Sequence, residues 1–318
     1  MNPTITLPVA GPGQVPANGS DPDELVLTPG GYKPRSKVFL IETGHHIAGR
    51  NDRLWKIESS TGREVQDLGA TQRHVFPLKP HFPRQLSLLQ TRTTEPLPAP
   101  GDGWVAYAVW MNTNIKAINQ FTANWIVPSA PVVTANQTIF LFIGMQNTEF
   151  ILQPVLQWGK SAAGGGDYWS ISNWYTDGKE SSTCYTDPVR VEPGQTLRAN
   201  IQLLAQVDRS FTYMALFENY PGLKLEKDDV IELLYANVVL ESYRVTSANQ
   251  YPADGPASIN DVRVFIQDQP VSPAWQLEPH QIVPTRPSVL ISGLLGNTIE
   301  LDFGQSAAIR QQITTFQD

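Results

Sequence analysis

Two glutamine side chains in one expected strand are the first candidates for chemistry. The segment 151–159 reads Ile-Leu-Gln-Pro-Val-Leu-Gln-Trp-Gly, and strand alternation puts Gln153, Val155 and Gln157 on one face. A carboxamide both donates and accepts hydrogen bonds, so it can hold a water molecule or stabilise an oxyanion. The structural alternative is that these amides lie on the solvated side of a sheet.

The next expected strand, Tyr168–Tyr175, adds aromatic, hydroxyl and amide groups. Aromatic rings with a few amides are typical of small-molecule and sugar sites. Burial of the rings in a sandwich core is the alternative explanation. The candidate substrate-binding residues are Gln153, Trp158, Trp169, Asn173, Trp174 and Tyr175.

The histidines show no metal-binding pattern. His45 and His46 are adjacent, so in a strand they point to opposite faces. His74, His81 and His280 fall in proline-containing loops. The chain also lacks G-x-S-x-G, P-loop and G-x-G-x-x-G motifs. We therefore expect no metal site and no cofactor.

Strands must position these candidates, because the composition favours an all-β protein. Only 17% of the 318 residues are charged, and 26 Pro and 23 Gly supply many turns. From Trp104 onward, short apolar segments alternate with turn sequences such as Thr176-Asp-Gly178. This spacing predicts a sandwich or barrel of antiparallel strands. The segment Leu225–Ala236 is the one candidate for a short helix.

The composition along the chain predicts four regions. They are an extended Pro/Gly-rich arm (1–35), a β-rich extension (36–103), a β-sandwich domain (104–305) and a C-terminal tail (306–318). The extension has three expected strands: Lys37–Thr43, Arg53–Glu58 and Arg84–Arg92. These strands contain too few apolar residues for a core of their own, so we expect the extension to pack on the sandwich.

Charge and termini limit the partners. The net charge of −7 argues against nucleic acid and anionic membranes. No apolar stretch is long enough to span a bilayer.

The N-terminus lacks the basic and apolar regions of a signal peptide, which favours the cytoplasm, with a processed secreted form as the alternative. Cys184 is the single cysteine, so no internal disulfide is expected. The sequence does not indicate an oligomeric state.

Several short motifs occur in a characteristic order. They are Ile143-Gly144, Val155-Leu-Gln-Trp-Gly159, Tyr168…Trp174-Tyr-Thr-Asp177, Val191-Glu-Pro-Gly-Gln195 and Asn237…Glu241. In this order they resemble the eqolisins, the acid glutamic peptidases, over about residues 104–305. The resemblance implies a concanavalin-like or jelly-roll sandwich of two curved antiparallel sheets, with a Gln/Glu dyad on the concave face.

The resemblance also implies catalytic roles. Gln157, in Leu156-Gln-Trp-Gly159, matches the family's glutamine, and Glu241 matches its glutamate. The glutamate would act as general base on a water molecule and then as acid, and the amide would hold that water and stabilise the oxyanion. Gln153 is the alternative for the amide role. At Phe142, Met145-Gln146 and Asn173 the chain departs from the tryptophan and acidic residues of the family.

Three functions stay open at this stage. The first is an eqolisin-like acid hydrolase, a peptidase, that uses Gln157 and Glu241. The second is a carbohydrate-binding, lectin-like protein that uses the aromatic and amide residues of the same sheet. The third is an enzyme of another class that acts on a small molecule in the same cleft. The expected ligand is accordingly a peptide, a glycan or a small molecule, and whether the protein is an enzyme is not decided.

Overall fold

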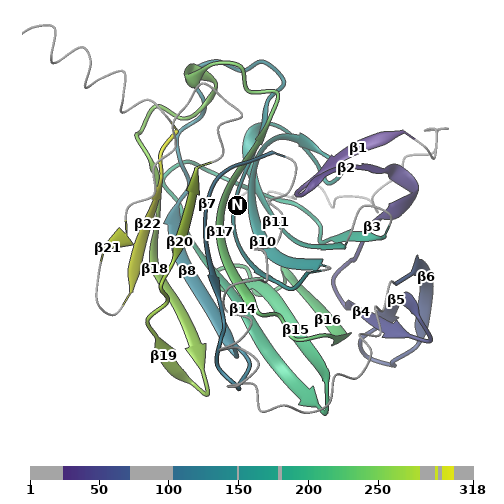
Figure 1. Cartoon of the computed structure of the whole chain (residues 1–318). Coiled ribbons are helices and arrows are strands. Elements are labelled where there is room, and N and C mark those ends of the chain that lie inside the picture. The colour runs from purple at the N-terminus through teal and green to yellow at the C-terminus, as the bar shows by residue number, and fades with distance from the viewer. Residues whose placement is uncertain are drawn as a thin grey trace, which may run out of the picture.

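The computed structural model describes residues 24–71, 103–148, 150–177, 181–279, 291–292 and 296–303. Their regular structure is almost entirely β-strand, and most strands belong to two large sheets (Figure 1). Short 3-10 turns at Arg35–Lys37 and Ala248–Gln250 are the helical elements of this part of the chain. None of its helices is long and apolar enough to cross a membrane. The predicted all-β sandwich is confirmed.

The first sheet carries the candidate residues and has nine strands among the described residues. In spatial order they are β20 (Gln276–Pro279), β7 (Trp104–Met111), β17 (Tyr235–Tyr243), β9 (Thr138–Gln146), β10 (Phe150–Ser161), β11 (Gly164–Asp177), β12 (Thr183–Tyr185) and β3 (Val38–Leu40), with β13 (Val189–Val191) paired to β11. All pairs are antiparallel except β12 with β3.

The second sheet has eleven strands in the described part of the chain. In order they are β21 (Ile291–Ser292), β22 (Asn297–Leu301), β18 (Ala257–Ile266), β8 (Gln120–Ile126), β14 (Thr196–Val207), β15 (Ser210–Phe217), β16 (Lys224–Val230), β4 (His45–Arg50), β5 (Arg53–Glu58) and β6 (Glu64–Ala70), with β19 (Gln269–Val271) paired to β18.

The N-terminal strands extend both sheets. β3 pairs in parallel with β12 in the first sheet, and β4 pairs in parallel with β16 in the second. Upstream of them, β1 (Leu25–Thr28) and β2 (Gly31–Pro34) form a separate hairpin, which lies beside β10 and β11 in Figure 1. We call this element the β1–β2 hairpin.

Two sequence-based expectations differ from the structure. Residues 25–34, expected within an extended arm, form the hairpin. The expected helix at Leu225–Ala236 is instead β16 followed by the start of β17. In β16 the side chains of Leu225 and Lys227 are buried while their neighbours are less so, which is the period-2 pattern of a strand. The expected strand Arg84–Arg92, the tail 306–318, and the loops of His74, His81 and His280 lie outside the described residues.

Apolar side chains form two separate clusters, one on each face of the first sheet. The larger cluster fills the space between the sheets and includes Leu141, Leu156 and Ile171. The smaller cluster lies on the opposite face, which we call the covered face. It consists of Leu27, Trp104, Tyr107, Val109, Phe140, Phe142, Ile151, Val155, Ala163, Trp174, Tyr235 and Val239. Leu27 comes from the hairpin, so the hairpin covers this face.

Candidate active site

Glu241 and Gln157 lie in one row across the first sheet. Glu241 on β17 is opposite Phe140 on β9, and Phe140 is opposite Gln157 on β10. Residues directly opposite one another share a sheet face, so both side chains lie on the covered face with Phe140 between them. Two strand spacings separate them, which is about 10 Å between their backbones. The sheet therefore brings the two sequence-predicted residues together in one row, 84 positions apart in the chain.

The Glu241 carboxylate is fully buried and receives hydrogen bonds from two directions. Its side chain is 0% exposed. The hydroxyl of Tyr243, two residues along the same strand, donates to Oε1. The backbone N–H of Gly30, at the tip of the hairpin, donates to the same oxygen at 2.7 Å. A buried carboxylate needs such donors, and here one of them comes from a distant segment of the chain.

The Gln157 amide is buried and fully hydrogen-bonded. Its Nε2 donates to the carbonyls of Gly159, at 2.8 Å, and Gly164, at 3.0 Å. Its Oε1 accepts a 2.7 Å hydrogen bond from the Ser161 hydroxyl. In this conformation Gln157 holds the turn between β10 and β11. It shares no hydrogen-bond partner with Glu241 in these contacts.

The hairpin tip lies in a concavity of the sheet. Gly30 bonds to Glu241 on β17, and a Cβ added to Gly30 would lie 3.3 Å from Cγ2 of Thr176 on β11. These strands are three positions apart in the sheet order, which is about 14 Å on a flat sheet. One glycine can reach both only because the sheet curls around the hairpin. The covered face is thus concave, and the hairpin occupies it.

The row of Glu241 and Gln157 does not line the cavity beside the end of β10. A cavity of about 330 Å³ opens beside the end of β10, with Gln137, Gly159, Lys160 and Arg244 among its lining residues. Neither Gln157 nor Glu241 lines it. Gln157 and Glu241 are 2% and 0% exposed, so both candidate catalytic groups are buried.

Gln153, the alternative amide, lies on the same face as Gln157 but has a different environment. It is opposite Trp174 of β11 and is 1% exposed. Neither its Oε1 nor its Nε2 has a hydrogen-bond partner. The predicted alternation of Gln153, Val155 and Gln157 is correct, since Val155 belongs to the apolar cluster of the covered face.

Most of the other candidate substrate-binding residues lie on the opposite face. Trp158, Trp169 and Tyr175 belong to the cluster between the sheets. Asn173 is 0% exposed and its amide donates to the backbone carbonyl of Leu223. These four side chains are therefore part of the sandwich interior, and the structure does not bring them together with Gln157. They alternate with the covered-face residues along β10 and β11.

Trp174 alone among the aromatic candidates lies on the covered face, where it is 0% exposed. Its ring stacks on Tyr185 of β12 at 5.0 Å, and its indole N–H donates to the Ser172 hydroxyl. The exposed aromatic platform that a sugar site needs is thus not formed by these residues. Its absence follows from their burial within the sandwich and under the hairpin.

Sequence reasoning missed Gly30 and Ser161, which contact the two candidate catalytic side chains. A hairpin turn at Gly30 could have been predicted from the segment Leu25-Val-Leu-Thr-Pro-Gly-Gly31, which is a short apolar run followed by Pro-Gly. Pro-Gly at the centre of a four-residue turn is typical of a type II turn, and Gly30 has the required positive φ of 92°. Within the described residues, no three His, Cys, Asp or Glu side chains gather as metal ligands.

Comparisons with known proteins give structural neighbours only. No protein-family model matches the chain, and no curated protein matches it. Among solved structures, the chain is similar to scytalidoglutamic peptidase with a peptide-based transition-state analogue, at 18% identity and a TM-score of 0.41, over 63% of this chain and 97% of that one. It is also similar to SCP-B, a member of the eqolisin family in complex with the tripeptide Ala-Ile-His, at 17% identity and a TM-score of 0.39. This similarity covers 63% of this chain and 97% of SCP-B.

A third neighbour is aspergilloglutamic peptidase from Aspergillus niger, at 11% identity and a TM-score of 0.32, over 52% of this chain and 98% of that one. Similarities at TM-scores below 0.5 establish no activity for this chain. These three solved structures are glutamic peptidases of the eqolisin family.

Proposed function

We propose that this protein is an acid hydrolase of the glutamic-peptidase type, with Glu241 as general base and acid and Gln157 as its amide partner. The observation that supports this proposal is the shared row: a buried carboxylate and a buried amide, two strands apart on one concave face. The motif Leu156-Gln-Trp-Gly159 and its distance from Glu241 in the sequence add to it.

The chemistry requires one proton to move twice. The Glu241 carboxylate takes a proton from a water molecule as the water oxygen attacks the carbonyl carbon of the substrate. The Gln157 N–H groups donate to the oxyanion that forms. The Glu241 carboxyl then gives its proton to the leaving nitrogen as the C–N bond breaks. The products are an acid and an amine, and Glu241 is a carboxylate again.

The described conformation is the closed state of this site. A water molecule and a substrate carbonyl need the place beside Glu241 that Gly30 now occupies. Gln157 must also exchange its bonds to the Gly159 and Gly164 carbonyls for bonds to the substrate. Hydrolysis therefore requires movement of the β1–β2 hairpin away from the covered face.

The test is hydrolysis of a denatured protein at acid pH, in the range where carboxyl groups titrate, about pH 3–5. The assay compares the full chain, Gly30→Ala, and Gly30→Ala combined with Glu241→Gln. Glu241→Gln keeps the size of the side chain and removes the titrating group, so activity should be lost while the fold is kept.

Glu218→Gln is the matched control, because Glu218 is an exposed glutamate beyond the end of β15. Activity in this control should equal that of the parent. Proteolysis that survives Glu241→Gln would overturn the proposal, as would the absence of hydrolysis from both the full chain and Gly30→Ala.

A further inference from the structure

We propose that the cavity beside the end of β10 binds a small zwitterion, an amino acid or dipeptide, with its carboxylate at Arg244 and Lys160 and its ammonium at Asp167. The cavity measures about 330 Å³, which is at the lower end of the range for small-molecule sites. Neither candidate catalytic group lines it. The proposal therefore does not rest on the proposed function.

The charged lining of this cavity comes from three strands that are distant in the sequence. Lys160 lies near the end of β10, Asp167 lies in β11, and Arg244 directly follows the last residue of β17. Gly159 and residues 135–137 complete the lining. Two cationic side chains and one anionic side chain thus line one small space.

Arg244 is held at the cavity by its backbone and by a hydrogen bond. Its φ of +57° lies in the left-handed region, which residues other than glycine rarely adopt and which occurs often at ligand-binding sites. Its Nη2 donates to Oγ1 of Thr138 at 3.2 Å, and that hydroxyl donates to the carbonyl of Lys160 at 2.8 Å. Thr138 therefore links the guanidinium of Arg244 to the part of β10 that carries Lys160.

The three charged side chains are not paired. Lys160, Asp167 and Arg244 form no ion pair with one another or with any other residue that the structure describes. A guanidinium has five N–H donors, and Thr138 accepts from one of them. The planar fork of the others matches a carboxylate. Opposite charges that line one cavity without contact leave the space between them to a ligand.

The signs of the three charges define the ligand. A simple carboxylate would bind Arg244 and Lys160 but would be repelled by Asp167, and a simple amine would meet two cations. A zwitterion complements all three groups. Amino acids and short peptides carry both charges at pH 7, because their α-carboxyl and α-amino groups are then ionised. Asn136, an exposed amide in the lining, can bond to the peptide group of a dipeptide.

The first experiment compares three probes by NMR titration into the full chain at pH 7, outside the acid range of the proposed hydrolysis. Glycylglycine carries both charges, N-acetylglycine has the carboxylate alone, and glycinamide has the ammonium alone. We expect glycylglycine to shift the backbone amide signals of Gly159 and Lys160, and to bind about tenfold more tightly than either other probe. Equal affinities for the three probes, or no shift with glycylglycine, would overturn the proposal.

The second experiment assigns each charge of the ligand to a side chain. Arg244→Gln should weaken the binding of glycylglycine and N-acetylglycine about tenfold, and should not weaken that of glycinamide. Asp167→Asn should weaken glycylglycine and glycinamide instead, and should not weaken N-acetylglycine. The probe that each variant still binds shows that the cavity is intact, so misfolding cannot imitate this pattern. A variant that binds glycylglycine as tightly as the parent does would contradict the assignment and overturn the proposal.

The matched controls change the same charges away from the cavity. Arg198→Gln lies on β14 and Asp208→Asn in the turn that follows it, and both residues are exposed and absent from the lining. We expect all three probes to bind these variants as they bind the parent. A loss of glycylglycine affinity equal to that in Arg244→Gln or Asp167→Asn would mean that net charge alone attracts the probes, and the site would not exist.

Discussion

The backbone amide of Gly30 donates a hydrogen bond to the carboxylate of Glu241 across 211 positions of the chain. A residue near the N-terminus thereby satisfies the side chain that the sequence marks as the candidate base. The contact is made by backbone, so it depends on the position of the hairpin and not on the side chain at its tip. The N-terminal segment is therefore part of the candidate site.

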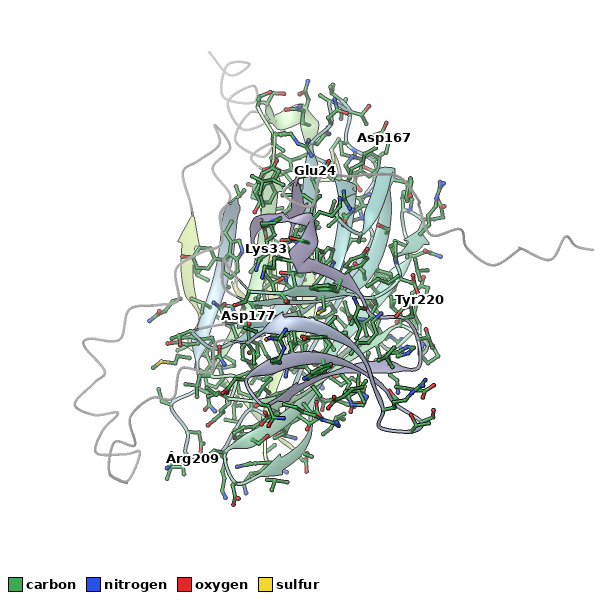
Figure 2. The ribbon with its side chains drawn as sticks, turned by 90° about the vertical axis from the view of Figure 1, so that its right-hand side faces the viewer. Glu24, Lys33, Asp167, Asp177, Arg209 and Tyr220 are labelled. Atoms are coloured by element: carbon green, nitrogen blue, oxygen red, sulfur yellow. The ribbon has the colours of Figure 1, made fainter. Side chains whose placement is uncertain are left out.

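Further contacts anchor the hairpin. The carbonyl of Leu27 accepts a hydrogen bond from the backbone of Ala162, at 2.7 Å, and the carbonyl of Pro29 accepts one from the Thr176 hydroxyl, at 3.3 Å. Lys33 on β2 donates to the carbonyl of Asp177, and Figure 2 shows these two residues close together where the hairpin crosses the sheet. These hydrogen bonds hold both strands of the hairpin against the first sheet.

Gly30→Ala should loosen the hairpin. A Cβ at a φ of +92° is strained by about 1–2 kcal/mol, and it would press on Cγ2 of Thr176 at 3.3 Å. We expect faster hydrogen exchange of residues 25–34, measured by mass spectrometry. Gly44→Ala is the control, because Gly44 has a φ of +91° and no atom within 4 Å of an added Cβ. It carries the same strain without the contact, so an equal change in the hairpin would contradict the prediction.

Lys33→Met should release the second strand of the hairpin. The Lys33 side chain is 3% exposed, and its ammonium donates to the carbonyls of Asp177 and Ser181. Methionine keeps the apolar stem and loses these charge-assisted bonds, which are worth about 1.5–3 kcal/mol each. Limited proteolysis should cut the chain at the hairpin faster than in the parent. Lys160→Met, at an exposed lysine of β10, should not change the rate.

Strand periodicity predicted the sheet that carries the site, because alternation alone decides the face of each residue in a strand. Gln153 and Gln157 share the covered face for this reason, and Glu241 joins them through the register of β17 with β9. The same alternation sends Trp158 and Trp169 to the other face. Whether an aromatic face is exposed or packed against a second sheet depends on distant strands, which periodicity cannot show.

The composition of the N-terminal segment did not predict the β1–β2 hairpin. Proline and glycine are common in residues 1–35, which suggests an extended arm. Leu27 of the short strand Leu25–Thr28 packs into the apolar cluster that contains Val155 of the first sheet, a long-range contact that no local pattern contains. The expected helix Leu225–Ala236 failed similarly, since pairing with β15 and β4 decides the conformation of β16.

Cys184 should be unreactive in the folded protein. Burial raises the pKa of its thiol from 9.0 to about 12, although Lys227 and Lys56 lower it in part. The thiolate is the reactive form, so iodoacetamide at pH 8 should label Cys184 only after unfolding. Labelling of the native protein at the rate of a free thiol would contradict this.

The same shift predicts a pH dependence of stability. The folded thiol holds its proton more tightly than the unfolded one. Its contribution to the free energy of unfolding is therefore complete below pH 9 and is lost as the pH rises toward about 12. The free energy of unfolding should therefore fall between these values, by at most about 1.4 kcal/mol per pH unit. Cys184→Ala cannot titrate, so the difference in unfolding free energy between parent and variant should change over this range. A difference that stays constant from pH 8 to pH 11 would contradict the prediction.

Gly159→Ala should disturb the turn that Gln157 holds. Gly159 lies at the register shift between β10 and β11, and its carbonyl accepts from the Gln157 amide. A Cβ there would lie 2.1 Å from the backbone oxygen of Gln137, which cannot rotate away. Gly194→Ala is the matched control, since Gly194 has the same φ of +85° and open space around it. Both variants carry the strain of a left-handed alanine, about 1–2 kcal/mol, and Gly159→Ala should lose about 1–3 kcal/mol more because of overpacking. Chemical denaturation measures both losses, and equal losses would mean that β10 and β9 move apart at no cost to accommodate the new methyl group.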